Sequence, residues 1–182
     1  KPVTDKFLSV TGAVVKPVVL RVPLGTNVRE CIAAADLAVG GDYAVLVGGP
    51  MMGRVLTDPK AIDGTVVTKT TGNLAILPMD HYLVTRSVLS IENMKHQARS
   101  ACVQCRMCTD MCPRHLIGHE VTPHQVMQNV WREETLPDEE YVRCFGSALN
   151  CCDCGLCEMF SCPMGLSPRR INGWFKQRFR EK

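Results

Sequence analysis

The chain has 182 residues, of which 46% are hydrophobic and 21% are charged, and its formal net charge is +3. This length allows one domain or two small ones, and no apolar run is long enough to span a bilayer. Eleven cysteines without a secretory signal in these residues favour metal binding over a disulfide framework. The first residues are Lys-Pro-Val, so we expect a fragment of a longer protein.

Short strands around one helix are predicted for the first half of the chain. Asn27, with Glu30 three residues later, has the spacing of a capping box, which predicts a helix through about Leu37. Alternating or apolar stretches predict strands at 7–14, 18–22, 43–47, 54–57, 65–68 and 73–77. A hairpin, one helix and further strands indicate a small α+β domain over residues 1–88.

A glycine-rich turn, Gly-Gly-Pro-Met-Met-Gly at residues 48–53, follows one of the predicted strands. It does not have the G-x-G-x-x-G spacing of a dinucleotide-binding loop. Glycines are commoner in tight turns than in phosphate sites, so a turn is the favoured interpretation.

Helical patterns dominate residues 89–182. Helices are predicted to begin at Ser90, at Thr122-Pro123, at Pro137 and at Ser167-Pro168. The second of these is expected to turn Val126, Met127, Val130 and Trp131 inward. The last one is amphipathic, which suits a helix that covers the core; a docking face for an acidic partner is the alternative.

Two cysteine motifs carry the strongest signal. Residues 102–113 read C-x2-C-x2-C-x3-C-P, the spacing of a bacterial two-cluster ferredoxin, and residues 151–163 repeat it with four residues before the last cysteine. Three cysteines of one loop can wrap a cubane cluster, whereas the fourth cannot reach back and holds the other cluster. The predicted ligands are Cys102, Cys105, Cys108 and Cys162 for the first [4Fe-4S] cluster, and Cys112, Cys151, Cys154 and Cys157 for the second.

Some alternatives stay open. Cys152 can substitute for Cys151, and eight cysteines can bind two zinc ions, although zinc sites usually pair two short knuckles. His115, His119 and His124 follow the first motif and are expected to be surface or capping residues; contact with a corrinoid is the sharper hypothesis. No catalytic residue is predicted.

Charge gives no argument for nucleic acid as a partner. Each oxidised cluster with four thiolates carries roughly −2, so two clusters bring the net charge to 3 − 4 = −1. The basic composition of the chain is therefore expected to be offset in the loaded protein.

The first domain resembles SLBB, the soluble-ligand-binding β-grasp domain of RnfC-type proteins. Thr11-Gly12, residues 22–26 and the turn at 48–53 carry this resemblance. RnfC-type proteins, subunits of a membrane-bound ferredoxin:NAD oxidoreductase, share the layout of an SLBB domain followed by a two-cluster domain. Their first motif normally has glycine where this chain has Arg106.

The second domain looks closer to PduS-type cobalamin reductases within the same family. The two cysteine motifs, Gly118-His119, Pro123-His124, the widened second motif and residues 165–172 carry this resemblance. It implies an α+β protein with a small β-grasp (SLBB) domain over 1–88 and a mainly helical ferredoxin domain with two [4Fe-4S] clusters over 89–182.

The resemblance also implies a function. In this family NADH reduces an FMN in an upstream domain, and electrons pass through the clusters to cobalamin. The cob(I)alamin formed is passed to a corrinoid adenosyltransferase inside a propanediol-utilisation microcompartment in the cytoplasm. Shell or enzyme partners of the compartment are further expected contacts. This chain is then an electron conduit; an RnfC-like subunit that serves ferredoxin, and a zinc-bound module without redox activity, are the alternatives.

Overall fold

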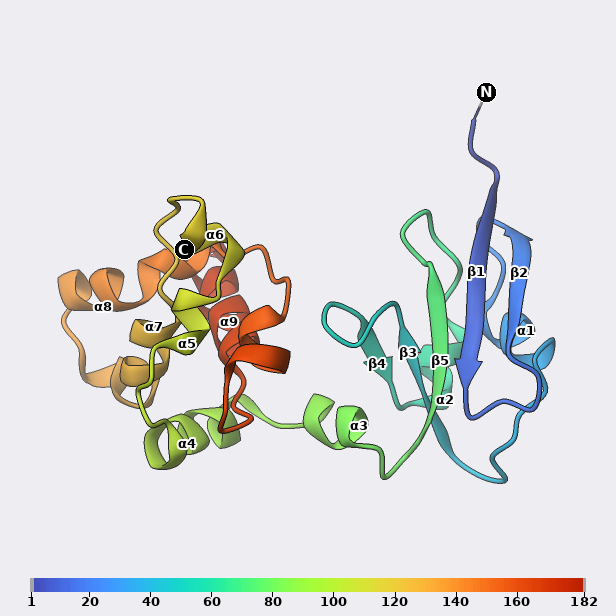
Figure 1. Cartoon of the computed structure of the whole chain (residues 1–182), viewed down its shortest axis with the longest axis horizontal. Coiled ribbons are helices and arrows are strands. Elements are labelled where there is room, and N and C mark those ends of the chain that lie inside the picture. The colour runs from blue at the N-terminus through green and yellow to red at the C-terminus, as the bar shows by residue number, and fades with distance from the viewer. Residues whose placement is uncertain (1, 182) are drawn as a thin grey trace. The chain divides into compact units, whose positions relative to one another are not determined.

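The computed structural model describes residues 2–181 of the chain. Two compact units are present, Lys1–Val88 and Leu89–Lys182. The first is built on a mixed sheet and the second is helical, so the chain has the predicted α+β class (Figure 1).

The sheet of the first unit has five strands in the order β2-β1-β5-β3-β4. Its central pair, β1 and β5, is parallel, and the remaining neighbours are antiparallel. This order, with a helix between the second and third strands, is the arrangement of a β-grasp fold. The strands are β1 (Asp5–Gly12), β2 (Val18–Pro23), β3 (Tyr43–Val47), β4 (Arg54–Leu56) and β5 (Asn73–Pro78).

Alternation along the strands separates the two faces of this sheet. Leu8 and Val10 of β1 point to the face that α1 (Val28–Ala33) covers, where Ile32 packs against them. A second, smaller apolar cluster is separate from this one and includes Leu46 of β3 and Val84 of α3 (Tyr82–Ser87). Burial of these side chains is the main stabilising contribution to the unit.

Several local predictions for this unit need correction. Helix α1 ends at Ala33 rather than near Leu37, because the chain turns there and Asp36 adopts a left-handed backbone with φ of 52°. Residues 65–68 form no strand; Val66 makes a single bridge to Asn27. Two short helices, α2 (Pro59–Asp63) and α3, were not predicted, since five or six residues show too little periodicity.

Close approach of the backbone explains two glycines of the first unit. A Cβ on Gly12 would lie 2.2 Å from the carbonyl oxygen of Ile76, on the strand paired with β1. Residues 48–53 connect β3 to β4, and the N–H of Gly53 donates to the carbonyl of Gly49 at 2.7 Å. The glycine-rich segment is therefore a tight turn, as predicted.

The second unit packs helices and short turns around an aromatic core. Phe145 and Phe175 stack with ring centroids 3.9 Å apart, and the ring of Tyr141 meets both edge-on. The elements are α4 (Ile91–Ala101), α5 (Met107–Asp110), α6 (Pro113–Leu116), α7 (Pro123–Asn129), η1 (Val130–Thr135), α8 (Asp138–Phe145), η2 (Gly146–Asn150), η3 (Cys157–Ser161) and α9 (Pro168–Glu181).

The predicted helix starts in this unit are largely correct. Ser90 caps α4 by accepting the N–H of Asn93 at 3.2 Å. The prediction for Trp131 is wrong: the chain changes to a 3-10 turn at Val130, and the indole is 46% exposed beneath Arg99. A narrower turn rotates the side chain away from the face that a continuous α-helix would bury.

Candidate metal centres

The two cysteine loops have the same backbone. In each loop the residue before the second cysteine is left-handed, Gln104 and Asp153 both with φ of 55°. The residue after that cysteine is left-handed as well, with φ of 66° at Arg106 and 83° at Gly155. This match aligns Cys151 with Cys102, which favours Cys151 over Cys152 as the first cysteine of the second loop.

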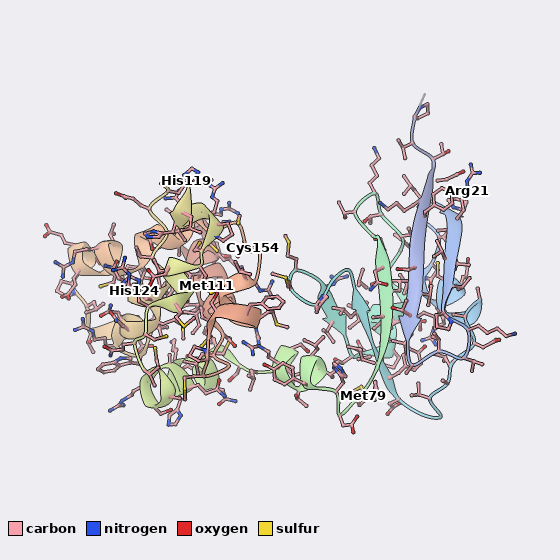
Figure 2. The ribbon with its side chains drawn as sticks, viewed as in Figure 1. Arg21, Met79, Met111, His119, His124 and Cys154 are labelled. Atoms are coloured by element: carbon pink, nitrogen blue, oxygen red, sulfur yellow. The ribbon has the colours of Figure 1, made fainter. Side chains whose placement is uncertain are left out.

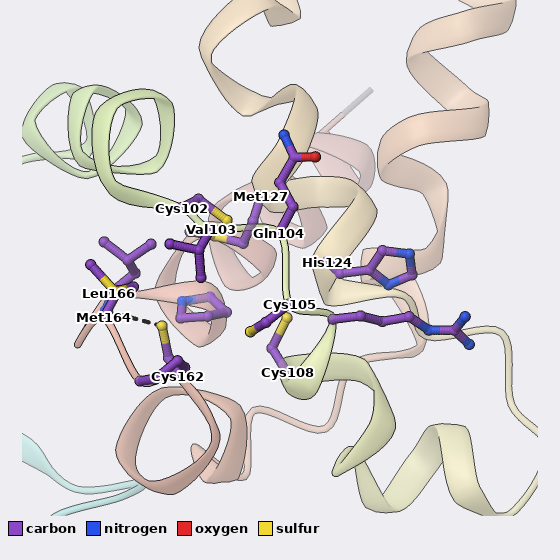
Figure 3. Close-up of a pocket in the computed structure, with 13 residues that line it drawn as sticks. Cys102, Val103, Gln104, Cys105, Cys108, His124, Met127, Cys162, Met164 and Leu166 are labelled. Atoms are coloured by element: carbon purple, nitrogen blue, oxygen red, sulfur yellow. Dashed lines mark hydrogen bonds between the residues drawn. The ribbon is translucent and has the colours of Figure 1, made fainter.

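The first hollow of the second unit is bounded by sulfur atoms from two distant segments. Figure 3 shows these side chains around one space, with Cys162 entering from the opposite side to the first loop. Leu166 N–H donates to the sulfur of Cys162 at 3.4 Å. The cysteines that line this hollow are Cys102, Cys105, Cys108 and Cys162.

The second hollow repeats the arrangement with the roles exchanged. Its lining cysteines are Cys112, Cys151, Cys152, Cys154 and Cys157. Cys112 ends the first motif, so each hollow takes the last cysteine of the other motif. Asp153 N–H donates to the sulfur of Cys151 at 3.4 Å, and Cys152 is exposed.

Burial disfavours thiolates in both hollows unless a cation compensates them. Burial, with a further contribution from the neighbouring sulfurs of Cys102, Cys162 and Cys105, raises the pKa of Cys108 to about 12. Burial likewise raises the pKa of Cys151 to about 11, against the opposing effect of the Asp153 N–H. A bound cationic core stabilises deprotonated thiols, so this donor set fits an iron–sulfur cluster.

The widened spacing of the second motif has a structural cause. In the first motif the chain passes to Cys112 through the α-helical turn α5, whereas in the second motif it passes to Cys162 through a π-helical turn, η3. A π-turn holds one more residue than an α-turn. The extra residue is therefore absorbed within the turn, and Cys162 still reaches the first hollow.

Helix α9 supports the second loop through residues that the sequence did not single out. Lys176, whose side chain is 15% exposed, donates to the carbonyl of Cys151 and pairs with Asp153 at 3.3 Å. Glu158, inside the π-turn, accepts the backbone N–H of Arg170 at 3.2 Å near the start of α9. No sequence pattern could have paired these residues, since they lie far apart in the chain.

The three histidines after the first motif do not line one common site. His124 lines the first hollow, and its Nδ1 is 2.7 Å from the hydroxyl of Thr109. His115 lies in the last turn of α6, and His119 follows Gly118, whose φ of 94° breaks the helix between them. His119 and His124 lie apart in the second unit (Figure 2). His115 and His119 instead line a separate groove on the surface of the second unit.

Residues 101–167 match the family model of the 4Fe-4S dicluster domain. The class that the fold and the paired cysteine hollows define is thus a two-cluster iron–sulfur protein. Both [4Fe-4S] clusters predicted from the spacing are confirmed as the cofactors of this domain.

Among curated proteins, the chain is similar to cobalamin reductase PduS. It is 42% identical over 179 residues to the PduS proteins of Citrobacter freundii and Salmonella typhimurium. Each match covers 98% of this chain but 38% of the relative, so the chain spans well under half the length of these proteins. The predicted resemblance to PduS-type proteins is confirmed for this segment.

A weaker match links the chain to RnfC-type proteins. One subunit of the ion-translocating oxidoreductase complex of Salmonella arizonae is 30% identical over 122 residues, covering 66% of this chain and 16% of the relative. Among solved structures, the NAD+-reducing [NiFe]-hydrogenase in its H2-reduced state matches 97% of this chain and 28% of its own, with 17% identity and a TM-score of 0.46. Within residues 2–181, no helix combines the length and apolarity needed to cross a membrane.

Proposed function

We propose that this chain is the electron-transfer part of an NADH-dependent cobalamin reductase. The observation that carries the proposal is the pair of four-cysteine hollows in a chain 42% identical to cobalamin reductase PduS over 98% of its length. When bound, [4Fe-4S] clusters each take up and release one electron with little rearrangement of the protein.

The proposed ligand sets are crossed between the two motifs. Cys102, Cys105 and Cys108 hold the first cluster together with Cys162, and Cys151, Cys154 and Cys157 hold the second together with Cys112. The hollow linings and the matched left-handed positions of the loops support this assignment.

The arrangement of the cysteines weighs against the zinc alternative. Structural zinc sites usually pair two short knuckles of two cysteines each. Each hollow here is lined instead by three proposed ligands of one loop and the last cysteine of the other motif. This arrangement is the one that a pair of four-iron clusters requires.

The protein's own residues supply the environment of the clusters. Backbone N–H groups of Asp153 and Leu166 donate to ligand sulfurs, and such donors stabilise thiolates. Lys176 brings a positive charge beside the second loop. Burial of Cys112 and Cys157 limits water access to the second site.

The remaining roles follow from the resemblance to the longer relatives. Residues 1–88 are proposed to be an SLBB domain and residues 89–182 the ferredoxin domain. FMN and NADH would bind in a domain upstream of this segment. Cobalamin would be the substrate and a corrinoid adenosyltransferase the recipient, within a cytoplasmic microcompartment. The β-grasp order of the sheet supports the first of these assignments.

Metal and sulfide analysis of anaerobically purified protein is the first test. About eight irons and eight sulfides per chain are expected for two four-iron clusters, with negligible zinc. Two zinc ions without sulfide would reject the electron-transfer function.

Single serine variants test the ligand set. Cys151→Ser is expected to lose one cluster, whereas Cys152→Ser is expected to keep both. The reverse result would move the second cluster to Cys152 and break the alignment of the two loops.

A corrin-reduction assay on the full-length protein tests which molecule accepts the electrons. NADH-dependent formation of cob(II)alamin would support the cobalamin reductase. Reduction of a ferredoxin with no corrinoid reduced would favour the RnfC-like alternative, which the 30% identity to the ion-translocating oxidoreductase complex motivates.

A further inference from the structure

A groove of about 740 Å³ lies on the second unit, outside the two cysteine hollows. Small-molecule sites commonly have volumes of about 300–1,000 Å³. One wall is the loop that follows α6, and the other is formed by α8 and η2. This groove has no part in holding the clusters.

Both walls of the groove continue directly into proposed ligands of the second cluster. Helix α6 begins at Pro113, directly after Cys112, and η2 ends at Asn150, directly before Cys151. The walls are tied together, since Arg114 Nε donates to the carbonyl of Asn150 at 3.2 Å. A molecule in the groove would therefore lie beside the segments that carry the second cluster.

The lining combines imidazoles, hydroxyls and apolar surface. His115 and His119 come from one wall together with the charged Glu120, and Val142 and Leu149 come from the other together with the charged Arg143. The Thr122 hydroxyl donates to Ser147 at 3.0 Å, which fixes polar groups at the end of the groove. Such a lining suits a broad ligand with apolar faces, a polar rim and a metal that accepts nitrogen.

We propose that this groove binds a corrinoid, with the imidazole of His115 or His119 as an axial ligand of cobalt. The proposal rests on the proposed function, because that function supplies the corrinoid. A corrin has apolar faces and an amide-bearing rim, and cobalt(III) and cobalt(II) accept imidazole nitrogen. Cobalt(I) does not retain an axial ligand, so the reduced product would leave the imidazole and could be passed on.

Cobinamide is the probe for this test. It lacks the nucleotide base with which a cobalamin can coordinate its own cobalt. Full-length protein with oxidised, EPR-silent clusters is mixed with cob(II)inamide. A nitrogen ligand must then come from the protein, and it splits each cobalt line into three. We expect this splitting in the wild type and its loss in the His115→Ala/His119→Ala double variant.

The second readout is the affinity of the protein for aquacobinamide, measured by titration with visible difference spectroscopy. The double histidine variant and Leu149→Trp, which fills the groove, are each expected to bind at least tenfold more weakly. His96→Ala, an exposed histidine of α4, is the matched control and should bind as the wild type does. Iron content of every variant shows that the cluster domain has folded.

The outcomes separate this proposal from the proposed function. Wild-type affinity in the groove variants, with corrinoid still reduced by the full-length protein, would reject the groove and leave the function standing. Binding without nitrogen splitting would reject the imidazole ligand. If the wild type neither binds nor reduces a corrinoid, the proposed function itself fails.

Discussion

Arg106 and Gly155 occupy the same position in the two cysteine loops, directly after the second cysteine, and both have a left-handed backbone. Glycine adopts this conformation without strain, whereas a residue with a Cβ pays about 1–2 kcal/mol. The first loop therefore holds a strained arginine where the second holds a relaxed glycine.

Replacement of Arg106 should reveal this strain. We expect R106G to be more stable than R106A by about 1 kcal/mol in anaerobic denaturant unfolding, because alanine retains the left-handed penalty. Both variants lose the exposed ion pair with Asp110, so that contribution cancels in the comparison. Equal stability of the two variants would show that the strain is relieved elsewhere.

Deletion of Phe160 tests the π-turn. This side chain is 67% exposed, and its removal would restore three residues between Cys157 and Cys162. We expect the turn to become α-helical and the protein to keep its full iron content, because the first motif has the same spacing. A loss of about half the iron would show that the extra residue is needed to bring Cys162 to its site.

Lys176 should set the reduction potential of the second cluster. Removal of its charge leaves the Asp153 carboxylate uncompensated beside the loop, and one charge at a half-buried site is worth on the order of 1–2 kcal/mol. We expect Lys176→Met to lower the potential of one cluster by tens of millivolts in an EPR-monitored redox titration. Arg180→Met removes a charge from an exposed position of the same helix and should leave both potentials nearly unchanged. An equal shift in the reduction potentials of both clusters would contradict a local effect of Lys176.

A buried carboxylate, Glu133, should contribute strongly to the stability of the second unit. It is 5% exposed and pairs with Lys95 at 2.7 Å and Arg178 at 2.9 Å. Loss of one partner from a buried pair costs about 3–5 kcal/mol, and the partial exposure of Arg178 reduces this to roughly 2–4 kcal/mol for Glu133→Gln. The exposed neighbour Glu134, changed to Gln, should alter stability by less than about 0.5 kcal/mol. A similar loss in both variants would remove the special role of Glu133.

His124 should make the second unit sensitive to mild acid. Burial lowers the pKa of His124, and the positive charge of Arg106 lowers it further, so the folded state favours the neutral ring. The unfolded side chain keeps a pKa near about 6.5, so this stability is present above that pH and is lost as the pH falls. We expect His124→Gln to flatten the decline of the melting temperature as the pH falls below about 6.5, and to leave the melting temperature at higher pH with the same pH dependence as the wild type. His96→Gln is the control, and only samples that retain their iron are compared; an unchanged decline in His124→Gln would contradict the assignment.

The spacing of the cysteines predicted two cluster sites because three of the four ligands of each cluster come from one short loop. The sequence also predicted the strands of the sheet and the cap of α4 by Ser90, since these depend on local periodicity and local hydrogen bonds. The π-turn was not predicted, although the widened spacing of the second motif was its visible trace.

Features that depend on distant segments could not be predicted. Lys176 reaches Asp153 only because α9 packs beside the second loop, and the groove exists only because α6 and η2 are brought together. The prediction that Trp131 is buried failed for a local reason, since nothing in the sequence signals the change from an α-turn to a 3-10 turn at Val130.

The position of β5 makes the first unit dependent on its last strand. β5 lies between β1 and β3, so without it the sheet is reduced to two separate two-stranded ribbons. Isolated pairs of strands are marginally stable in water. During synthesis β1 can therefore pair with β5 only after residues 73–78 have left the ribosome, and the five-stranded sheet forms only then. A cut or a premature stop before this strand would leave an open sheet edge on β1, available for pairing with other chains.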